Sequence, residues 1–346
     1  MIPDKLFDAL CCGARAAVYE AWAQAHYRPG KVPDEIDHIF ALMRVGVREL
    51  GANWSPVLKP HGIALRVTGV FCHQTPKAHY DHPTAGRKRP ELGDLLVVHE
   101  HKVTTAAGPV VTRRAVLVQA KMVDQGIPGS GKVDQYQEYL YEHWPDFDLK
   151  GRGPAGQNYL SGMRNFRPSE DSGRYGLVER QAVHVQVPVA FPFCCGFPWT
   201  FSQALKPIST AGGEDAGAFI ANMLFETQWH RGRTAAIPAT PLSLLGSAPN
   251  HHFDVTVEEL LTLTGKKTLR FRNKSYVGGE REEAVACFQA ANGFTSLLPS
   301  TGERFAPSEG DVGREPPREI GEEGFDDGIS LLVIETGAEG RSPPSD

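Results

Sequence analysis

Two short apolar segments constrain the fold of this chain more than any other feature of its sequence. Leu95–Glu100 and Val110–Met122 are rich in β-branched and aliphatic residues, and an Ala-Ala-Gly-Pro sequence that ends at Pro109 separates them. This pattern predicts two strands joined by a turn. In an antiparallel hairpin, the start of the first strand lies beside the end of the second. The polar residues at those two positions are therefore expected to meet at one end of a sheet.

The segments on either side of this hairpin have the composition of helices and further strands. Apolar residues recur at helical spacing in Asp4–His26, Asp34–Leu50 and Asp134–Trp144, and Gly or Pro follows each of them. Ile63–Phe71 and Ile329–Glu335 have the apolar composition of strands, and the second of these must dock back onto the fold. The sequence therefore predicts an α/β (α+β) protein with a mixed central sheet flanked by helices.

The length of the chain, 346 residues, corresponds to about two domains. Residues 1–180 contain the hairpin and the N-terminal helices, and we expect them to form one domain. Residues 181–346 form an accessory region for which three roles are open: target recognition, an oligomerisation surface, or an extension of the same sheet. Within this region, residues 300–328 are acidic and rich in Pro and Gly, which predicts a mobile loop.

The charge of the chain excludes one class of partner and leaves another open. A net charge of −5 at pH 7 is not that of a strongly basic, histone-like protein. Residues 302–328 alone hold nine acidic residues and three arginines, a local charge of −6, so the rest of the chain carries +1. Because this remainder is nearly neutral, a nucleic acid is still an acceptable partner.

Composition and cysteine content indicate a soluble, cytoplasmic protein. Hydrophobic residues make up 41% of the chain, yet no apolar run approaches the about 20 residues of a membrane helix. The first residues lack the basic and apolar regions of a signal peptide. The six cysteines contain no C-x-x-C pair, so neither a disulfide framework nor a paired metal site is expected. No membrane partner is predicted.

The polar residues at the hairpin end are typical of metal-assisted phosphodiester hydrolysis. Asp94 starts the first strand, while Gln119 and Lys121 end the second and share one face, with Ala120 pointing the other way. Mg²⁺ or Mn²⁺ prefers oxygen ligands, which Asp94, the Gln119 amide and the Ala120 carbonyl can supply. Lys121 is expected to orient the attacking water and to stabilise charge on the phosphate.

Asp94 followed by Gln119-Ala120-Lys121 resembles the motif of the restriction-endonuclease-like PD-(D/E)XK nuclease superfamily. The resemblance is greatest to the Mrr-like branch, in which Gln replaces the second acid, and it covers residues 34–145 as a helix, a strand, the motif hairpin and a helix. It implies a restriction-endonuclease-like core with C-terminal additions. It also implies a Mg²⁺-dependent DNA nuclease of a restriction, repair or defence system.

The resemblance also implies a glutamate on the first helix of the core, facing the metal. Glu49 is our candidate, because helical-wheel arithmetic places it at the edge of the apolar face, and Glu35 near the same edge is the competitor. Glu91 is a third carboxylate that could complete the site. The Glu91-Leu92-Gly93-Asp94 sequence departs from the Pro-Asp of the family motif.

Basic residues near the motif suggest how a nucleic acid would be bound. Arg87, Lys88 and Arg89 precede the motif and are predicted to contact a phosphate backbone of DNA or RNA. Lys132 ends a Gly-rich loop that nearly matches a phosphate-binding loop, but Val133 stands where Ser or Thr should reach Mg²⁺. Two other hypotheses therefore remain: an NTPase that uses Lys132, and an inactive nuclease fold that only binds nucleic acid or a protein partner. A homo-oligomer is also open.

The residues around the predicted third helix leave one further choice open. Tyr136, Tyr139 and Trp144 lie at helical spacing and either stack on nucleic-acid bases or belong to the core. The segment from His73 to Pro90 is rich in His, Pro and basic residues and is expected to be a loop. Its histidines have no zinc-site spacing.

Overall fold

The computed structural model describes most of the chain, in thirteen ranges. These are residues 2–26, 32–72, 76–105, 107–125, 127–128, 133–150, 159–168, 171–181, 198–226, 231–238, 242–273, 285–292 and 329–338. Lys132 and the acidic segment 300–328 lie outside the described residues, so the predictions made for them stay predictions. Within those ranges, no helix combines the length and the apolar composition that crossing a membrane requires.

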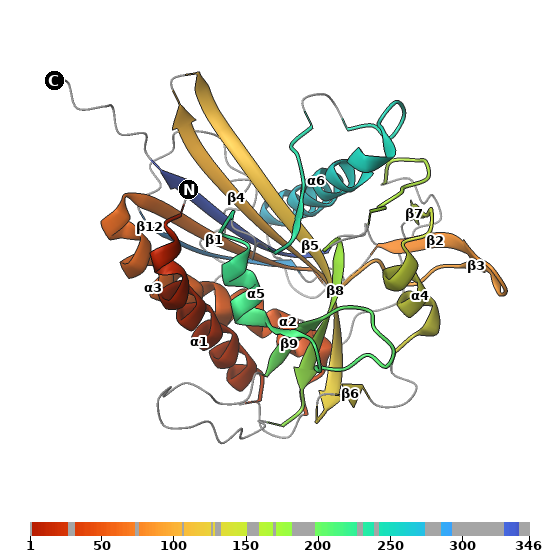
Figure 1. Cartoon of the computed structure of the whole chain (residues 1–346), viewed down its shortest axis with the longest axis horizontal. Coiled ribbons are helices and arrows are strands. Elements are labelled where there is room, and N and C mark those ends of the chain that lie inside the picture. The colour runs from red at the N-terminus through yellow and green to blue at the C-terminus, as the bar shows by residue number, and fades with distance from the viewer. Residues whose placement is uncertain are drawn as a thin grey trace.

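A mixed sheet forms the centre of the molecule and confirms the predicted fold class (Figure 1). Its strands run in the order β10-β9-β8-β5-β4-β13-β1-β12, and β6 and β11 both pair with β5. Their bounds are β1 Ile63–Cys72, β4 Leu95–Thr105, β5 Gly108–Asp124, β6 Ile127–Pro128, β8 Gly173–Glu179, β9 Trp199–Ser202, β10 Glu214–Asp215, β11 Arg233–Thr234, β12 Val285–Asn292 and β13 Ser330–Ala338. A separate small sheet has the order β3-β2-β7, with β2 Lys77–His82, β3 Gly86–Lys88 and β7 Asp148–Lys150.

Helices pack on both faces of the large sheet. Apolar side chains of β4 point alternately to the two faces, and helices bury them on each face. Leu95 and Val97 point into the core under α1, α2, α3 and α5, whereas Leu96 and Val98 point into the core under α4 and α6. The helix bounds are α1 Phe7–His26, α2 Glu35–Ala41, α3 Val47–Leu58, α4 Gln135–His143, α5 Ala216–Asn222 and α6 His252–Asn273. Short helical turns cover η1 Asp4–Leu6, η2 Leu42–Gly46, η3 Lys59–His61 and η4 Pro249–His251.

The hairpin predicted from the sequence is the antiparallel pair β4–β5, in which Leu95 pairs with Val118. Both strands are longer than expected, because β4 continues to Thr105 and β5 begins at Gly108. The far ends of the two strands are mostly exposed and project beyond the helices, as the yellow strands show (Figure 1). Backbone pairing, rather than apolar composition, carries the hairpin through this exposed part, and composition alone could not reveal it.

The second predicted helix was expected to end at Leu50, and this boundary is wrong. The helix contains a π-helical turn at η2 and continues as α3 to Leu58. Gly51 lies inside α3, where an added Cβ would overlap with the side chain of Ala290 on β12. The glycine therefore allows close approach of helix and strand, and does not terminate the helix.

Strands from beyond residue 180 lie in the middle of the same sheet. β13 sits between β1 and β4, antiparallel to the first and parallel to the second. β12 pairs with the other side of β1, and β9 pairs with β8. Within the described residues, strands from both sides of residue 180 therefore belong to one sheet.

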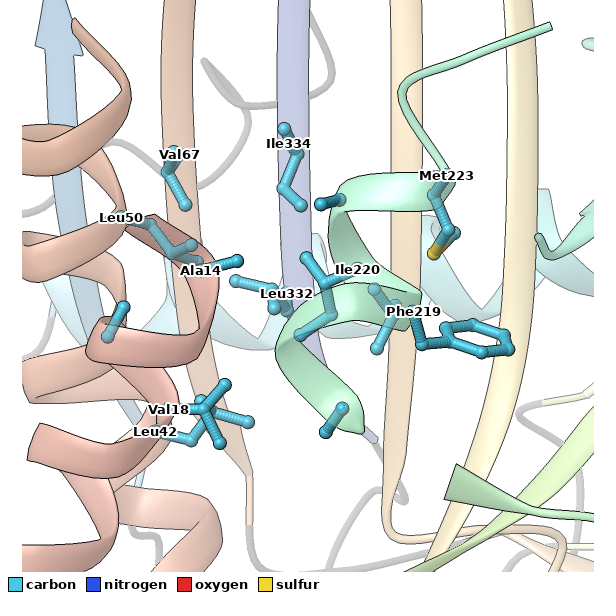
Figure 2. Packing of buried hydrophobic residues seen from close by; sticks show 14 of the residues in the cluster. Ala14, Val18, Leu42, Leu50, Val67, Phe219, Ile220, Met223, Leu332 and Ile334 are labelled. Atoms are coloured by element: carbon cyan, nitrogen blue, oxygen red, sulfur yellow. The ribbon is translucent and has the colours of Figure 1, made fainter. Parts of the chain in front are cut away.

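The core on the α1 side joins the two halves of the chain through one layer of apolar side chains. Figure 2 shows Ala14 and Val18 of α1 on one side and Ile220 of α5 on the other, in front of strand β13 with Leu332 and Ile334. α1 comes from the first residues that the structure describes and β13 from the last, so neither half encloses this core without the other.

The crossing of α1 and α5 is close enough to require a glycine. A Cβ added to Gly217 would lie 2.7 Å from the carbonyl carbon of Ala14 and equally close to Cα of Arg15. We expect Gly217→Ala to destabilise the protein by about 1–3 kcal/mol, because backbone atoms cannot rotate away. The better helix propensity of Ala offsets only part of this. Urea unfolding measures the effect.

Gly46→Ala is the control for this variant, because its added Cβ would meet mainly Cδ1 of Leu42, the far end of a flexible side chain. We expect that change to be much milder. Equal urea midpoints for the Gly217→Ala variant and the parent protein would contradict the prediction, because they would show that α1 and α5 can move apart without loss of stability.

Candidate functional site

The structure brings Asp94, Gln119 and Ala120 together at the end of the β4–β5 hairpin. The Asp94 backbone N–H donates to the Val118 carbonyl over 2.9 Å, which continues the pairing by one residue beyond β4. Oδ2 of Asp94 accepts hydrogen bonds from the Ala120 backbone N–H at 2.8 Å and from Nε2 of Gln119. Strand register alone therefore places this carboxyl group against the second strand of the hairpin.

The alternation of β5 separates these residues between the two faces of the sheet. Ala120 packs into the core under α1, whereas Gln119 is buried on the other face and contacts α4. Lys121, two residues after Gln119, shares the Gln119 face by the same alternation. Lys121 is half-buried, and its ammonium group acts electrostatically on Asp94. The amide and the lysine therefore face the same space, next to the carboxyl group.

The pKa of Asp94 lies near neutral pH. Enclosure by protein atoms raises its pKa from 3.8 to about 7, although part of the residue surface stays accessible. The Lys121 ammonium and the Ala120 N–H oppose this rise, whereas the Glu91 and Glu35 carboxylates add to it. Three carboxyl groups and one lysine thus act on one another at this end of the hairpin, as sites for acid–base or metal chemistry do.

Glu35, rather than Glu49, is the helix carboxylate at this site. Oε1 of Glu35 accepts a hydrogen bond from the Met122 backbone N–H at 3.0 Å, one residue beyond Lys121. Glu49 lies on α3, where it pairs with the exposed Arg48 at 2.8 Å. Helical-wheel arithmetic treats both glutamates as equivalent. However, fourteen residues of helix separate them by about 20 Å along the axis, and only the start of α2 reaches β5.

Gln137 of α4 is a member of the site that the sequence reasoning missed. Its Nε2 donates to Oε1 of Gln119 and, over 3.2 Å, to the Glu91 carbonyl, and it is buried. One turn later, the Tyr141 hydroxyl donates to the Leu92 carbonyl at 2.8 Å. Polar groups spaced i, i+4 on the buried face of a helix are the signal that could have found this pair.

The contact with Gln137 also changes the predicted role of Gln119. The Gln119 amide oxygen accepts from Gln137, so its nitrogen, and not its oxygen, is turned toward Asp94. A ligand role for this oxygen requires both amides to turn over.

The donor groups at this site fit a hard divalent cation better than zinc. Within the described ranges, no three His, Cys, Asp or Glu side chains stand close enough together to form a protein-only metal cage. Mg²⁺ needs no such cage, because it is usually held by one or two carboxylates and keeps several waters. Asp94, with Glu35 or Glu91 and a backbone carbonyl of β5, offers this kind of oxygen set.

The predicted basic residues occupy the small sheet, not a loop. Lys88 ends β3, and its Nζ lies 4.2 Å from the centroid of the Tyr136 ring. Nη1 of Arg87 lies 4.0 Å from Oδ1 of Asp81 on β2, and Arg89 follows β3 directly. The expected loop from His73 to Pro90 is therefore a hairpin in its described part, because backbone pairing with β7 also orders β2.

No protein-family model, curated protein or solved structure matches this chain. The site is therefore interpreted from its own chemistry: a half-buried carboxyl group with a raised pKa, a lysine on the same face, two further carboxylates and two buried glutamines.

Proposed function

We propose that the protein is a metal-dependent nuclease that hydrolyses phosphodiester bonds of DNA. The observation that carries this proposal is the position of Asp94 at the hairpin end, with Lys121 on one side and the Glu35 and Glu91 carboxylates within electrostatic range. Phosphodiester hydrolysis needs a cation to neutralise the phosphate and a positioned water, and this set of side chains can hold both.

The order of elements supports the resemblance to the PD-(D/E)XK superfamily. Helix α2–α3, strand β1, the hairpin β4–β5 and helix α4 follow one another in the range 34–145, as the resemblance implies. After α4 the chain returns as β8, parallel to β5 and next to it. One feature departs from the simplest form of such a core, because β13 separates β1 from the hairpin.

Each residue of the site has a distinct part in the proposed reaction. Asp94, with Glu35 or Glu91, would hold a Mg²⁺ ion, which supplies charge neutralisation and an activated water. Lys121 donates hydrogen bonds to that water or to a phosphate oxygen. Gln137 keeps the Gln119 amide in place beside Asp94. Cation binding requires the ionised Asp94, so a proton is released near neutral pH.

Cleavage assays on plasmid and linear DNA test the proposal. The parent protein and the Asp94→Ala and Lys121→Ala variants are incubated with Mg²⁺ or with EDTA, and single-stranded RNA is assayed in parallel. Cleavage that needs the cation and both residues supports the proposal. ATP turnover that is lost in Lys132→Ala would support the NTPase hypothesis instead. DNA binding without DNA cleavage or ATP turnover would support the third hypothesis, an inactive nuclease fold that only binds nucleic acid or a protein partner.

The two helix glutamates make a matched pair for a sharper prediction. We expect Glu35→Gln to reduce Mg²⁺-dependent cleavage about 10–100-fold, because it removes one of the carboxylates that act on Asp94. The Glu49→Gln variant is expected to cleave DNA like the parent protein. Glu49 lies on α3, not on α2 with Glu35, and it pairs with its neighbour Arg48. Initial rates over a range of Mg²⁺ concentrations measure both. The reverse order of effects would restore Glu49 as the metal-facing glutamate.

A further inference from the structure

The small sheet and α4 form a second surface that the proposed active site does not use. The β2–β3 hairpin lies against α4 at the edge of the molecule (Figure 1). The Tyr80 hydroxyl of β2 donates to the Tyr136 carbonyl of α4 at 2.6 Å. Tyr80 is fully buried, so this hydrogen bond anchors the hairpin to the helix.

Three rings on this surface are stacked nearly parallel. The Tyr80 and Tyr139 rings are 5.7 Å apart with an interplanar angle of 17°. Tyr139 and His143 are 4.2 Å apart with an angle of 18°. The exposure of the three residues increases along the stack, from the buried Tyr80 to the His143 side chain at 47%. The stack therefore leads from the interior to an exposed imidazole ring.

This stack resolves the choice left open for the aromatic residues of α4. Trp144 is only 1% exposed and packs against Phe166, so it belongs to the core. Tyr136 and Tyr139 keep partly exposed rings and contact His82 of β2, at 5.6 and 4.5 Å between centroids. Of the three α4 aromatic residues, Tyr136 and Tyr139 therefore lie at the surface and Trp144 does not.

Cations lie on both faces of the small sheet. Burial lowers the pKa of His79 on β2, and the charges of Lys150, Arg87 and Arg89 lower it further, so these three cations lie near His79 on the face opposite Tyr80. On the Tyr80 face, Lys88 is paired with Tyr80 across the two strands, and its Nζ lies over the Tyr136 ring. A phosphate beside the rings would therefore meet the positive charge of Lys88.

Some anionic groups near the rings have cationic partners. Asp81 pairs with Arg87 on the small sheet. Glu138 and Glu142 of α4 lie 3.9 and 3.4 Å from Nζ of Lys206, and Glu142 also lies 3.7 Å from Nδ1 of His143. The negative charge of these carboxylates is therefore partly neutralised.

The surface is connected to the candidate active site through the backbone. Lys77 at the start of β2 pairs with Glu91, and the Leu92 N–H donates to the Pro76 carbonyl at 2.7 Å. On α4, Gln137 reaches the active site while its neighbour Tyr136 lies on the ring surface. The ring surface and the candidate active site therefore share α4 and the start of β2.

We propose that this surface binds unpaired bases of a single-stranded nucleic acid. One base continues the stack on the outer face of His143, while Lys88, which lies over the Tyr136 ring, contacts a phosphate of the same strand. Base stacking on aromatic rings combined with a positive groove is how single strands are bound without sequence readout. The inference deepens the proposed nuclease function by naming the substrate class as a single-stranded segment held beside the site, and the binding itself does not require catalysis.

Binding of fluorescein-labelled oligonucleotides by the full chain in EDTA tests the inference. The probes are oligo(dT), oligo(U) and a DNA duplex of equal length, followed by fluorescence anisotropy. We expect single strands to bind more tightly than the duplex. His143→Ala should weaken single-strand binding about tenfold, and His143→Tyr should retain it. His251→Ala removes another exposed histidine that contacts a neighbouring carboxylate and serves as the matched control.

The salt dependence of binding tests the cations separately. Lys88→Ala should reduce the slope of log affinity against log salt by about 0.7, the value for one phosphate contact on a single strand. Lys59→Ala, which removes an exposed lysine of η3 outside this surface, should leave the slope unchanged. Equal binding by parent protein and His143→Ala, or tighter binding of the duplex, overturns the inference.

The outcomes also separate this inference from the proposed nuclease function. Stacking-dependent binding without metal-dependent cleavage would leave the single-strand surface in place and refute the nuclease. Cleavage that needs Asp94, together with unchanged binding by His143→Ala, would support the nuclease and refute the surface.

Discussion

An Asp94→Asn variant is expected to lose Mg²⁺-dependent DNA cleavage by about a hundredfold to a thousandfold, and yet to resist unfolding better than the parent protein at pH 8. Asn matches Asp in shape but carries no charge, so it cannot hold a cation strongly. The opposite changes in activity and stability follow from the same property of Asp94, its raised pKa.

The expected gain in stability depends on pH in a defined direction. The pKa of Asp94 is about 7 in the folded protein, against a normal value of 3.8. Between these two values the folded state binds a proton that the unfolded state has lost, so stability falls as pH rises through this range. The loss from pH 4 to pH 8 amounts to about 2–4 kcal/mol, since partial accessibility moderates it. The asparagine variant lacks this loss.

Urea unfolding of both proteins from pH 4 to pH 8 measures the difference, because all other titrating groups are shared. We expect the variant to become the more stable of the two as pH rises. Addition of Mg²⁺ at pH 8 should stabilise the parent protein and leave the variant unchanged, since a ligand stabilises only the state that binds it. A variant that is less stable than the parent at every pH would show that the Asp94 charge is well compensated without metal.

Arg113→Met is the second change with a large expected effect, a destabilisation of about 3–5 kcal/mol. Arg113 of β5 is 3% exposed and donates to Glu100 of β4 and to Glu258 of α6, both at 2.8 Å. Methionine fills a similar volume but leaves two carboxylates without their shared partner in a water-poor interior. The cost arises because these two carboxylates lose the guanidinium group that they share, rather than from lost packing.

A Glu100→Met, Arg113→Met double variant is the control for that explanation. Glu100 and Arg113 are directly paired across the two strands, so the double change removes both members of one pair. We expect the double variant to be more stable than Arg113→Met alone. Thermal unfolding of the four proteins completes the cycle. Additive losses would contradict the proposed charge effect and would point to packing instead.

The sequence predicted the candidate site best at the β4–β5 hairpin, where strand pairing decides which polar residues meet. The apolar runs of β4 and β5 determine which residues face the core, and a period of two leaves no choice of face for Gln119 and Ala120. The meeting of Asp94 with these residues then follows from antiparallel pairing alone. The existence of α1, α4 and β13 followed equally from local patterns, because each has a continuous apolar face.

Helix ends and long-range partners were less accessible. Gly51 has the local signature of a helix terminus, and only the proximity of Ala290 explains why it lies within α3. The Glu35 and Glu49 positions are equivalent on a helical wheel, and the contact with Met122 depends on where α2 crosses β5. These are distances between segments that are far apart in the chain, and local periodicity does not contain them.

The sequence by itself determined the hairpin, its register and the polar residues at its end, because these depend on side-chain alternation and on strand neighbours in the chain. Only the tertiary structure decided that β13 enters between β1 and β4, that Gln137 reaches Gln119, and that protein atoms enclose Asp94 enough to raise its pKa. The physical reason is that the burial of a group and its contacts depend on segments that come from distant parts of the chain. The residues next to Asp94 or Gln119 in the sequence therefore do not reveal the pKa of the one or the partner of the other.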